Sequence, residues 1–294
     1  MRTWLLLPSF VVLVGAAYLL RRAAIVHWFP LSGCYCSEGR KDRAGAYIID
    51  VVMAYRYVWR RNLTYCGPVG GSSHPAEMDI LGLPPRREQS RGCTIVPTHS
   101  YRPKPHDPKP PEELSTWPTA FIQQLHKGLR VNCSGRFGGK PTVVVHLRRG
   151  DVTPSAHPSR YTSNNETIAV LRRLKLEQTH AVLVHSEKAS AEAFDDLTAA
   201  GYRLALDAPL RSAWSDMLCA DVLVMARSSF SYVPALFRGA QGASDVGERG
   251  RVVYQPHPTW ERVLPPLPSW EPFVSSSTPC CRVISKCVVY SKGI

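Results

Sequence analysis

The stretch VVVHLRRGDV, residues 143–152, decides the fold. A run of β-branched apolar residues ends at His146, and two arginines, a glycine and Asp151 follow. This pattern predicts a buried strand with charge at its carboxyl end, where open α/β sheets bind ligands. Arg148 and Arg149 would suit a phosphate or diphosphate, because a guanidinium is a planar fork of donors that stays charged. The alternative is a solvated loop with a local Arg–Asp pair.

Strands and helices alternate regularly after residue 141. The predicted strands are 142–147, 181–185, 202–206, 222–226 and 252–254, and the predicted helices are about 166–176, 189–200, 212–220 and 230–238. Such alternation is typical of parallel βαβ units, so we expect an α/β fold with a Rossmann-like parallel sheet over residues 141–260. A tail containing proline and cysteine, residues 261–294, would follow.

The chain before this sheet predicts a smaller, irregular α/β domain over residues 23–140. Its expected elements are an amphipathic helix over 45–61, strands over 63–66 and 93–96, and a helix near 119–130. We expect a turn at 67–71, an irregular polar segment at 72–92 and a Pro-rich segment without regular structure at 97–118.

Polar side chains follow several of the predicted strands. They are Arg148, Ser186-Glu187, Asp207 and Ser228-Ser229. Because the carboxyl ends of parallel strands share one edge of a sheet, we expect these groups to converge on one crevice. Each could instead cap a helix, as Ser228 and Ser229 could for the helix near Phe230. A helix N-terminus with hydroxyl groups is also a suitable binding site for a phosphate.

Composition and charge narrow the class of partner. The 294 residues carry a formal net charge of +13, and residues 21–140 hold 18 basic and 9 acidic side chains. A basic face could meet an anionic membrane or an acidic glycan. We expect no nucleic-acid partner, because the sequence has no zinc-finger spacing, RNP-like aromatic motif or basic heptad region.

The N-terminal segment predicts entry into the secretory pathway. Residues 4–20, WLLLPSFVVLVGAAYLL, carry no charge, and Arg21-Arg22 follow. Residues 1–22 would be a cleaved signal peptide or, as we favour, an uncleaved signal-anchor. The expected protein is then a single-pass type II protein of the Golgi or ER membrane with a luminal catalytic domain, or a secreted protein if the segment is cleaved.

Cysteines and sequons agree with that compartment. Nine cysteines permit disulfides and leave at least one unpaired, and we expect Cys219, in an apolar helix pattern, to be free and buried. Asn62, Asn132 and Asn165 begin N-glycosylation sequons. No metal site is predicted, because Cys34-x-Cys36 and Cys280-Cys281 lack the spacing of zinc knuckles.

The sequence His146-Leu147-Arg148-Arg149-Gly150-Asp151 resembles the HxRRxD motif of GDP-fucose-dependent fucosyltransferases, the α1,2-, α1,6- and protein O-fucosyltransferase group. The block from Asp207 to Ser231 is similar to a later motif of that group. Residues 45–66 loosely resemble its first βα region. The resemblance implies a GT-B-like fold and inverting, metal-independent transfer of fucose from GDP-fucose to a glycan or glycoprotein acceptor, without a cofactor. The chain also lacks the Asp-x-Asp metal signature.

The resemblance also implies roles for particular residues. Arg148 would hold the β-phosphate and stabilise the leaving GDP, and Arg149 would support it or touch the phosphates. His146 and Asp207 would contact guanine or ribose. Asp151 would orient the arginines. The diphosphate and fucose end of the donor would be lined by Ser228, Ser229 and Phe230.

The sequence also departs from the group's pattern. Residues 42–45, Asp-Arg-Ala-Gly, stand where the group has a phosphate-binding turn with an asparagine. No acceptor-activating base is evident, and His157 and Glu187 are candidates. Two alternatives therefore stay open: a glycosyltransferase that uses another nucleotide sugar, and a catalytically inactive glycan-binding relative in the secretory pathway.

Overall fold

The computed structural model describes residues 33–39, 41, 43–71, 74–88, 92–97, 116–238, 250–256, 261 and 264–273. Among these residues, no helix is long and apolar enough to cross a membrane. The apolar segment 4–20, the end of the tail with Cys280, Cys281 and Cys287, and most of the Pro-rich segment lie outside them.

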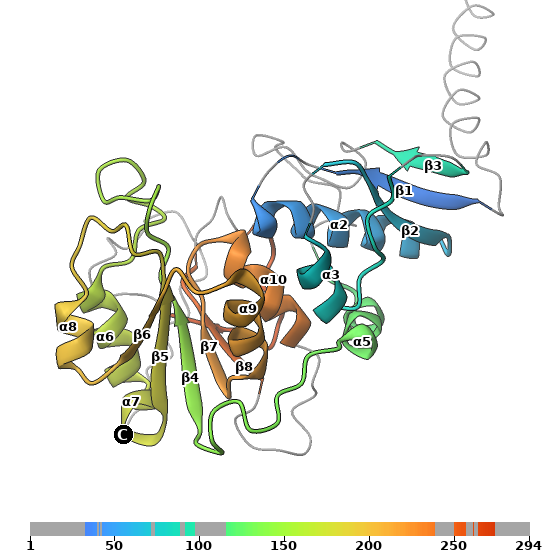
Figure 1. Ribbon diagram of the computed structural model, residues 1–294. Coiled ribbons are helices and arrows are strands. Elements are labelled where there is room, and N and C mark those ends of the chain that lie inside the picture. Colours follow the sequence, from blue (N-terminus) through green and yellow to red (C-terminus); the bar gives the residue numbers. More distant parts are fainter. Residues whose placement is uncertain are drawn as a thin grey trace, which may run out of the picture.

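Two parallel sheets confirm the predicted α/β class (Figure 1). The smaller sheet has the order β2-β1-β3, with β1 Cys34–Glu38, β2 Thr64–Val69 and β3 Cys93–Val96. The larger has the order β6-β5-β4-β7-β8-β9. Its strands are β4 Thr142–His146, β5 Ala181–Ser186, β6 Arg203–Leu206, β7 Val222–Val224, β8 Arg251–Tyr254 and β9 Glu271–Pro272. The chain starts at β4, runs outward to β6 and returns to β7, so the topological switch point lies between β4 and β7.

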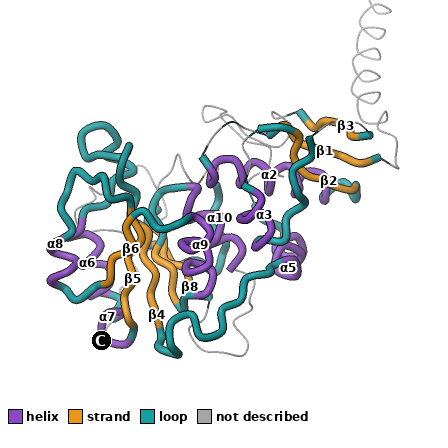
Figure 2. The backbone as a smooth tube through the Cα atoms, viewed as in Figure 1, coloured by secondary structure: helices purple, strands orange, loops and turns teal. Residues whose placement is uncertain are grey.

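Helices cover both faces of the large sheet (Figure 2). On one side lie α6 Asn164–Arg173, α7 Leu176–Thr179 and α8 Asp195–Ala199, and on the other lie α9 Leu210–Cys219 and α10 Ser229–Arg238. The first helix, α6, begins where Ser163 and Glu166 form a reciprocal capping box. The structure continues the sheet into the segment that we expected to be a tail, because β9 pairs with β8.

The N-terminal half contains α2 Ala44–Trp59, α3 Pro75–Ile80 and α5 Thr119–Gly128. Of these, α2 packs between the small sheet and α10 (Figure 1). Buried residues from both halves form one apolar cluster, which includes Tyr47 and Val52 of α2 with Tyr232 and Leu236 of α10. A second cluster fills the face under α6 and α8.

Gly45 allows the two halves to meet backbone to backbone. A Cβ at this position would lie 2.6 Å from the Phe230 backbone nitrogen. The start of α2 therefore rests directly against the start of α10, and only glycine fits this contact.

Several sequence expectations for the N-terminal half were wrong. The segment 72–92 contains α3, which Pro75 starts at the first helical position. Strand β2 extends to Val69, into the expected turn at 67–71, and the chain bends only at Gly70 and Gly71. Gly67, with φ +101°, lets the Pro85 carbonyl approach to 2.4 Å from the site of a Cβ. Strand β1 was not predicted, and it occupies the centre of the small sheet.

The expected helix over 189–200 is present only from Asp195 to Ala199. Residues before it form a loop, because the Glu192 carboxylate accepts hydrogen bonds from the Asn164 backbone N–H at 3.0 Å and the Tyr161 hydroxyl at 2.7 Å. These bonds tie Glu192 to the start of α6 and compete with helix formation.

Cys219 is not free, which corrects the sequence expectation. It forms a disulfide with Cys133, with a Cα–Cα distance of 5.2 Å. The buried residues of α9 are Ala213, Trp214, Ser215 and Met217, and Cys219 is half-buried at the last turn. Disulfides also join Cys34 to Cys66 and Cys36 to Cys93.

Candidate functional site

The candidate site lies at the carboxyl edge of the large sheet, around the switch point. Parallel register along β4, β5, β6 and β7 places the segments after these strands at the same edge. Arg148 follows β4, Glu187 follows β5, Asp207 follows β6, and Ser228 follows β7. The contact of Gly45 with the start of α10 brings the first loop of the small sheet to the same place.

A chain of alternating charges runs through this edge. The Arg148 guanidinium donates to the Glu187 carboxylate at 2.5 Å and also to Asp151. Asp151 in turn pairs with Arg43 from the N-terminal half, at 3.0 Å between Nη1 and Oδ1. Glu187 also accepts the backbone N–H of Arg149 at 2.9 Å. The HxRRxD motif therefore joins both halves of the molecule through its first arginine and its aspartate.

Glu187 forms an ion pair with Arg148. Burial raises the pKa of Glu187. This effect is larger than the opposite effect of the Arg149 backbone N–H, whose hydrogen bond favours the charged carboxylate. The Gly150 turn, with φ +67°, brings the motif close, because a Cβ there would lie 3.6 Å from the Glu187 carboxyl group. Of the two candidate bases, Glu187 contacts Arg148, and the contacts found for His157 lie within its own loop.

Arg149 points away from Arg148. Its side chain is 0% exposed. Its guanidinium donates to the Thr162 carbonyl at 2.7 Å, to Asn164 Oδ1 at 3.0 Å and to Glu192 at 3.2 Å. The guanidinium carbon also lies 4.4 Å from the Tyr161 ring centroid. Arg149 thus holds the segment before α6 in place, which is a positioning role.

His146 is buried beside the start of α10. Its ring centroid lies 4.9 Å from that of Phe230. Burial, and then the nearby positive charges of His185 and Arg149, lower its pKa to about 3. The imidazole is therefore neutral at physiological pH.

Sequence reasoning did not identify His185 as a site residue. It lies directly across from His146 in the sheet. Its Nε2 is 3.0 Å from Asp216, which also accepts from Arg136 at 2.6 Å. Burial raises the pKa of Asp216, but hydrogen bonds from His185 and Arg136 outweigh burial and hold it below its usual value. The one available signal was the position of His185 at the end of a strand.

Asp207 lies at the same edge but on β6, two strands away from β4. It adopts φ +51°, and its exposed carboxylate accepts the Lys188 backbone N–H at 3.0 Å. No contact between Asp207 and Arg148 is found. Neighbouring strands lie about 4.8 Å apart, so Asp207 would meet a part of a ligand roughly 10 Å from Arg148.

The segment from Arg227 to Phe230 starts α10. The buried Ser228 hydroxyl accepts the Phe230 N–H at 3.3 Å, so Ser228 does cap the helix. Ser229 and Phe230 are half-buried. Arg227, which sequence reasoning passed over, is buried and donates to the carbonyls of Ser159 and Pro256. It holds the loop between β4 and α6 against the end of β8.

One group within the described residues has the geometry to hold a metal ion. It consists of Cys34, Cys36 and Cys93, whose sulfur atoms lie within 4.8 Å of one another. All three are in disulfides, and a disulfide sulfur is not the thiolate that zinc requires.

No family model and no curated protein matches this chain. The solved structures that resemble it include POFUT1 in complex with GDP-fucose, at 13% identity and a TM-score of 0.36, over 77% of this chain and 74% of that one. They also include POFUT1 in complex with GDP, at 13% identity and a TM-score of 0.36, over 76% and 73% of the two chains. Likeness at this level assigns neither a donor nor an activity to the present chain. Any inference about its chemistry must therefore come from the residues of its own site.

Proposed function

We propose that this chain is a glycosyltransferase that transfers fucose from GDP-fucose to a glycan or glycoprotein acceptor, with inversion and without a metal ion. The observation that carries the proposal is the position of Arg148, at the switch point of a parallel sheet and paired with two carboxylates at the carboxyl edge of that sheet. The HxRRxD resemblance supplies the identity of the donor.

The carboxylates hold Arg148 where an anion would bind. A diphosphate carries more negative charge than Asp151 and offers the same oxygen acceptors, so it competes for the guanidinium. Arg43 shares Asp151 with Arg148 and is 63% exposed, so a diphosphate there can draw a cation from each half of the molecule. The N-terminus of α10 lies on the same side, and the positive end of the helix dipole there favours an anion.

These groups would stabilise the leaving group of the transfer. As the bond between fucose C1 and the β-phosphate oxygen breaks, its electron pair leaves on GDP, and negative charge grows on the diphosphate. Preorganised guanidinium groups and the positive end of the α10 helix dipole would stabilise that charge without a metal ion. Arg149 contributes by fixing the loop at 161–164, and neutral His146 packs against Phe230 at the start of α10.

Glu187 is our candidate for the general base. The acceptor hydroxyl attacks fucose C1 from the face opposite GDP and gives its proton to a base. Burial raises the pKa of Glu187, which strengthens it as a proton acceptor relative to an exposed carboxylate. Asp207 and Ser229 would serve the ribose or base and the diphosphate.

The test is GDP binding followed by transfer. Free GDP at roughly one hundred times its Kd should add about 2.7 kcal/mol to the free energy of unfolding, in buffer with EDTA. Arg148→Ala should lose this stabilisation, and Arg172→Ala, a change at a 64% exposed arginine on α6, should keep it. A folded protein that GDP does not stabilise would overturn the proposal.

A panel of donors separates the alternatives. Stabilisation by another nucleotide sugar, with GDP inert, would favour a different glycosyltransferase. The complete pairing of Arg148 with carboxylates also suits a glycan-binding relative without transfer. In that case Arg148→Ala leaves glycan binding intact, and no fucose is transferred by the unmodified chain.

We also propose a luminal location in the Golgi or ER with a single membrane anchor at residues 1–22. The three disulfides support an oxidising compartment. A fluorescent fusion that stays in the cytosol would contradict this location, and protease protection of the C-terminal half in intact microsomes would agree with it.

A further inference from the structure

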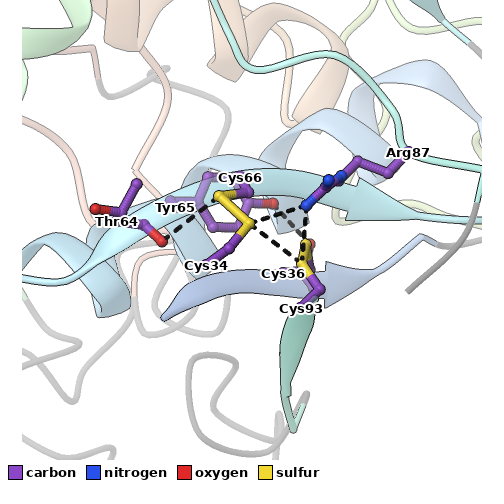
Figure 3. Close-up of a disulfide and its surroundings, with 8 residues drawn as sticks. Cys34, Cys36, Thr64, Tyr65, Cys66, Arg87 and Cys93 are labelled. Carbon is purple, nitrogen blue, oxygen red and sulfur yellow. Dashed lines mark hydrogen bonds between the residues drawn. A yellow bond between two sulfur atoms is a disulfide. The ribbon is translucent and has the colours of Figure 1, made fainter. Parts of the chain in front are cut away.

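Four cysteines gather on the small sheet, away from the candidate site. Cys34 and Cys36 lie on the central strand β1, Cys66 lies on β2, and Cys93 lies on β3 (Figure 3). The disulfides are Cys34–Cys66 and Cys36–Cys93. The two bonds are in contact, because Cys34 Sγ lies 3.6 Å from Cys93 Sγ. This is sulfur van der Waals distance, from which exchange between the two disulfides needs little movement.

The register of the strands allows a second pairing. Cys34 is directly opposite Cys93 in the sheet. On the other side, β1 and β2 shift register between Tyr35 and Ser37, so Cys36 lies opposite residues 66 and 67. Paired neighbours in a sheet have Cα atoms about 5 Å apart, within the range of a disulfide. The bonds Cys34–Cys93 and Cys36–Cys66 therefore fit the same backbone as the present ones.

Arg87 lies over the sulfur atoms. Its guanidinium donates toward Cys34 Sγ at 2.9 Å and lies 3.6 Å from Cys93 Sγ (Figure 3). The backbone holds Arg87 in this place, because its N–H donates to the Pro68 carbonyl at 2.8 Å and its carbonyl accepts from the Gly70 N–H at 3.3 Å. A cation beside a sulfur stabilises the thiolate, and a stabilised thiolate leaves a disulfide faster.

The two disulfides differ in their exposure to solvent. Cys34, Cys66 and Cys93 are half-buried, whereas Cys36 is 0% exposed. An attacking thiol can therefore approach either sulfur of the Cys34–Cys66 bond, but only the Cys93 sulfur of the other bond.

From these observations we propose that the four cysteines form a thiol-reactive site, which takes small monothiols of the glutathione class and exchanges its two disulfides between the pairings Cys34–Cys66/Cys36–Cys93 and Cys34–Cys93/Cys36–Cys66. The proposal is independent of the sugar-transfer chemistry.

The exchange balances without an external oxidant or reductant. The thiolate attacks Cys66 Sγ and forms a mixed disulfide, and the electron pair of the broken bond leaves on Cys34 beside Arg87. The Cys34 thiolate then attacks Cys93, and Cys36 leaves as a thiolate. Finally, Cys36 attacks Cys66 and expels the small thiol, which is returned unchanged. Each step breaks one S–S bond and forms one.

Peptide mapping of the full chain tests the proposal. The native protein is incubated with millimolar reduced glutathione, quenched with acid and N-ethylmaleimide, and digested without reduction. The Cys34–Cys93 link and glutathionylated Cys66 should accumulate, and no link should form between these four cysteines and Cys133 or Cys219. Glutathione that reduces Cys34–Cys66 without giving any Cys34–Cys93 link would overturn the proposal.

The variant Cys66→Ser tests the exchange without added thiol. It leaves Cys34 as a thiol beside the Cys36–Cys93 disulfide, so N-ethylmaleimide should label Cys34 in some molecules and Cys36 in others. Fragment ions on either side of Tyr35 distinguish the two. Label on Cys34 alone would refute the exchange. If this variant does not fold, the glutathione experiment on the unmodified chain still decides.

A matched pair of arginine variants tests the role of Arg87. Arg86 donates to the Gly71 carbonyl at 3.1 Å, and no contact with sulfur is found for it. Arg87→Ala should slow formation of the Cys34–Cys93 link roughly threefold to tenfold, since the leaving thiolate loses its cation. Arg86→Ala should leave the rate unchanged. Equal rates of Cys34–Cys93 formation in the two variants would show that Arg87 has no role in the exchange.

Discussion

Mutation of the two adjacent arginines of the HxRRxD motif should have different effects on stability and on GDP binding. Arg149 is completely buried, and its partner Glu192 has a side chain 28% exposed. Removal of one member of a buried pair costs about 3–5 kcal/mol, and the partial exposure of Glu192 places Arg149→Ala near the lower end, at about 3 kcal/mol. The Tyr161 stacking contact is lost as well.

Arg148→Ala should have the opposite profile. Arg148 itself is 10% exposed, but its partners reach solvent, with side chains 42% exposed for Asp151 and 33% for Glu187. After the mutation, Asp151 keeps Arg43 and Glu187 keeps the N–H of residue 149. The loss of stability should therefore lie between that of a surface pair and that of a buried pair, at about 1–2 kcal/mol.

Urea denaturation followed by tryptophan fluorescence measures the two losses by linear extrapolation. GDP-dependent stabilisation, measured on each folded variant, should disappear for Arg148→Ala and persist for Arg149→Ala. The reasoning would be refuted if Arg148→Ala cost as much stability as Arg149→Ala, or if the Arg149 variant were stable but unable to bind GDP.

Three further changes test the fold. Ser163→Ala removes the capping box of α6 and should cost about 1 kcal/mol in urea denaturation, and no loss would contradict the assigned cap. The double variant Cys133→Ala/Cys219→Ala opens a loop of sequence separation 86 and should cost about 4 kcal/mol, which a lower thermal midpoint would reveal. The pKa of His146 is about 3 in the folded state against 6.5 for a free histidine, so the unfolded chain takes up the proton first. Stability should be fully present above about pH 6.5 and be lost as the pH falls toward 3. His146→Gln should flatten this decline, and an unchanged slope would count against burial of a neutral ring.

The sequence was most informative where the chain is most apolar. The β-branched runs of β4, β5, β7 and β8 predict strands because they are buried on both faces of a parallel sheet. Strand β1, with the sequence CYCSE, has no such run, and its two parallel neighbours hold it in the sheet. The prediction of a helix from residue 189 was wrong for a similar reason, since the Glu192 side chain bonds to residues about thirty positions away.

The sequence predicted which side chains would lie at the carboxyl edge of the sheet, but not the directions in which they point. The end of each strand placed Arg148, Glu187 and Asp207 at one edge. The direction of Arg149 depends on Asn164 and Glu192, at separations of 15 and 43 residues, and no local pattern reports such contacts. The disulfide of Cys219 likewise depends on a partner 86 residues away.

The meeting of α2 and α10 at Gly45 has a consequence for how the molecule unfolds. Because one apolar cluster spans both helices, pulling the halves apart would expose Tyr47, Val52, Tyr232 and Leu236 to water together. The two sheets therefore belong to one cooperative unit, and heating should give a single melting transition for both. Neither sheet, expressed alone, would keep its helices in place.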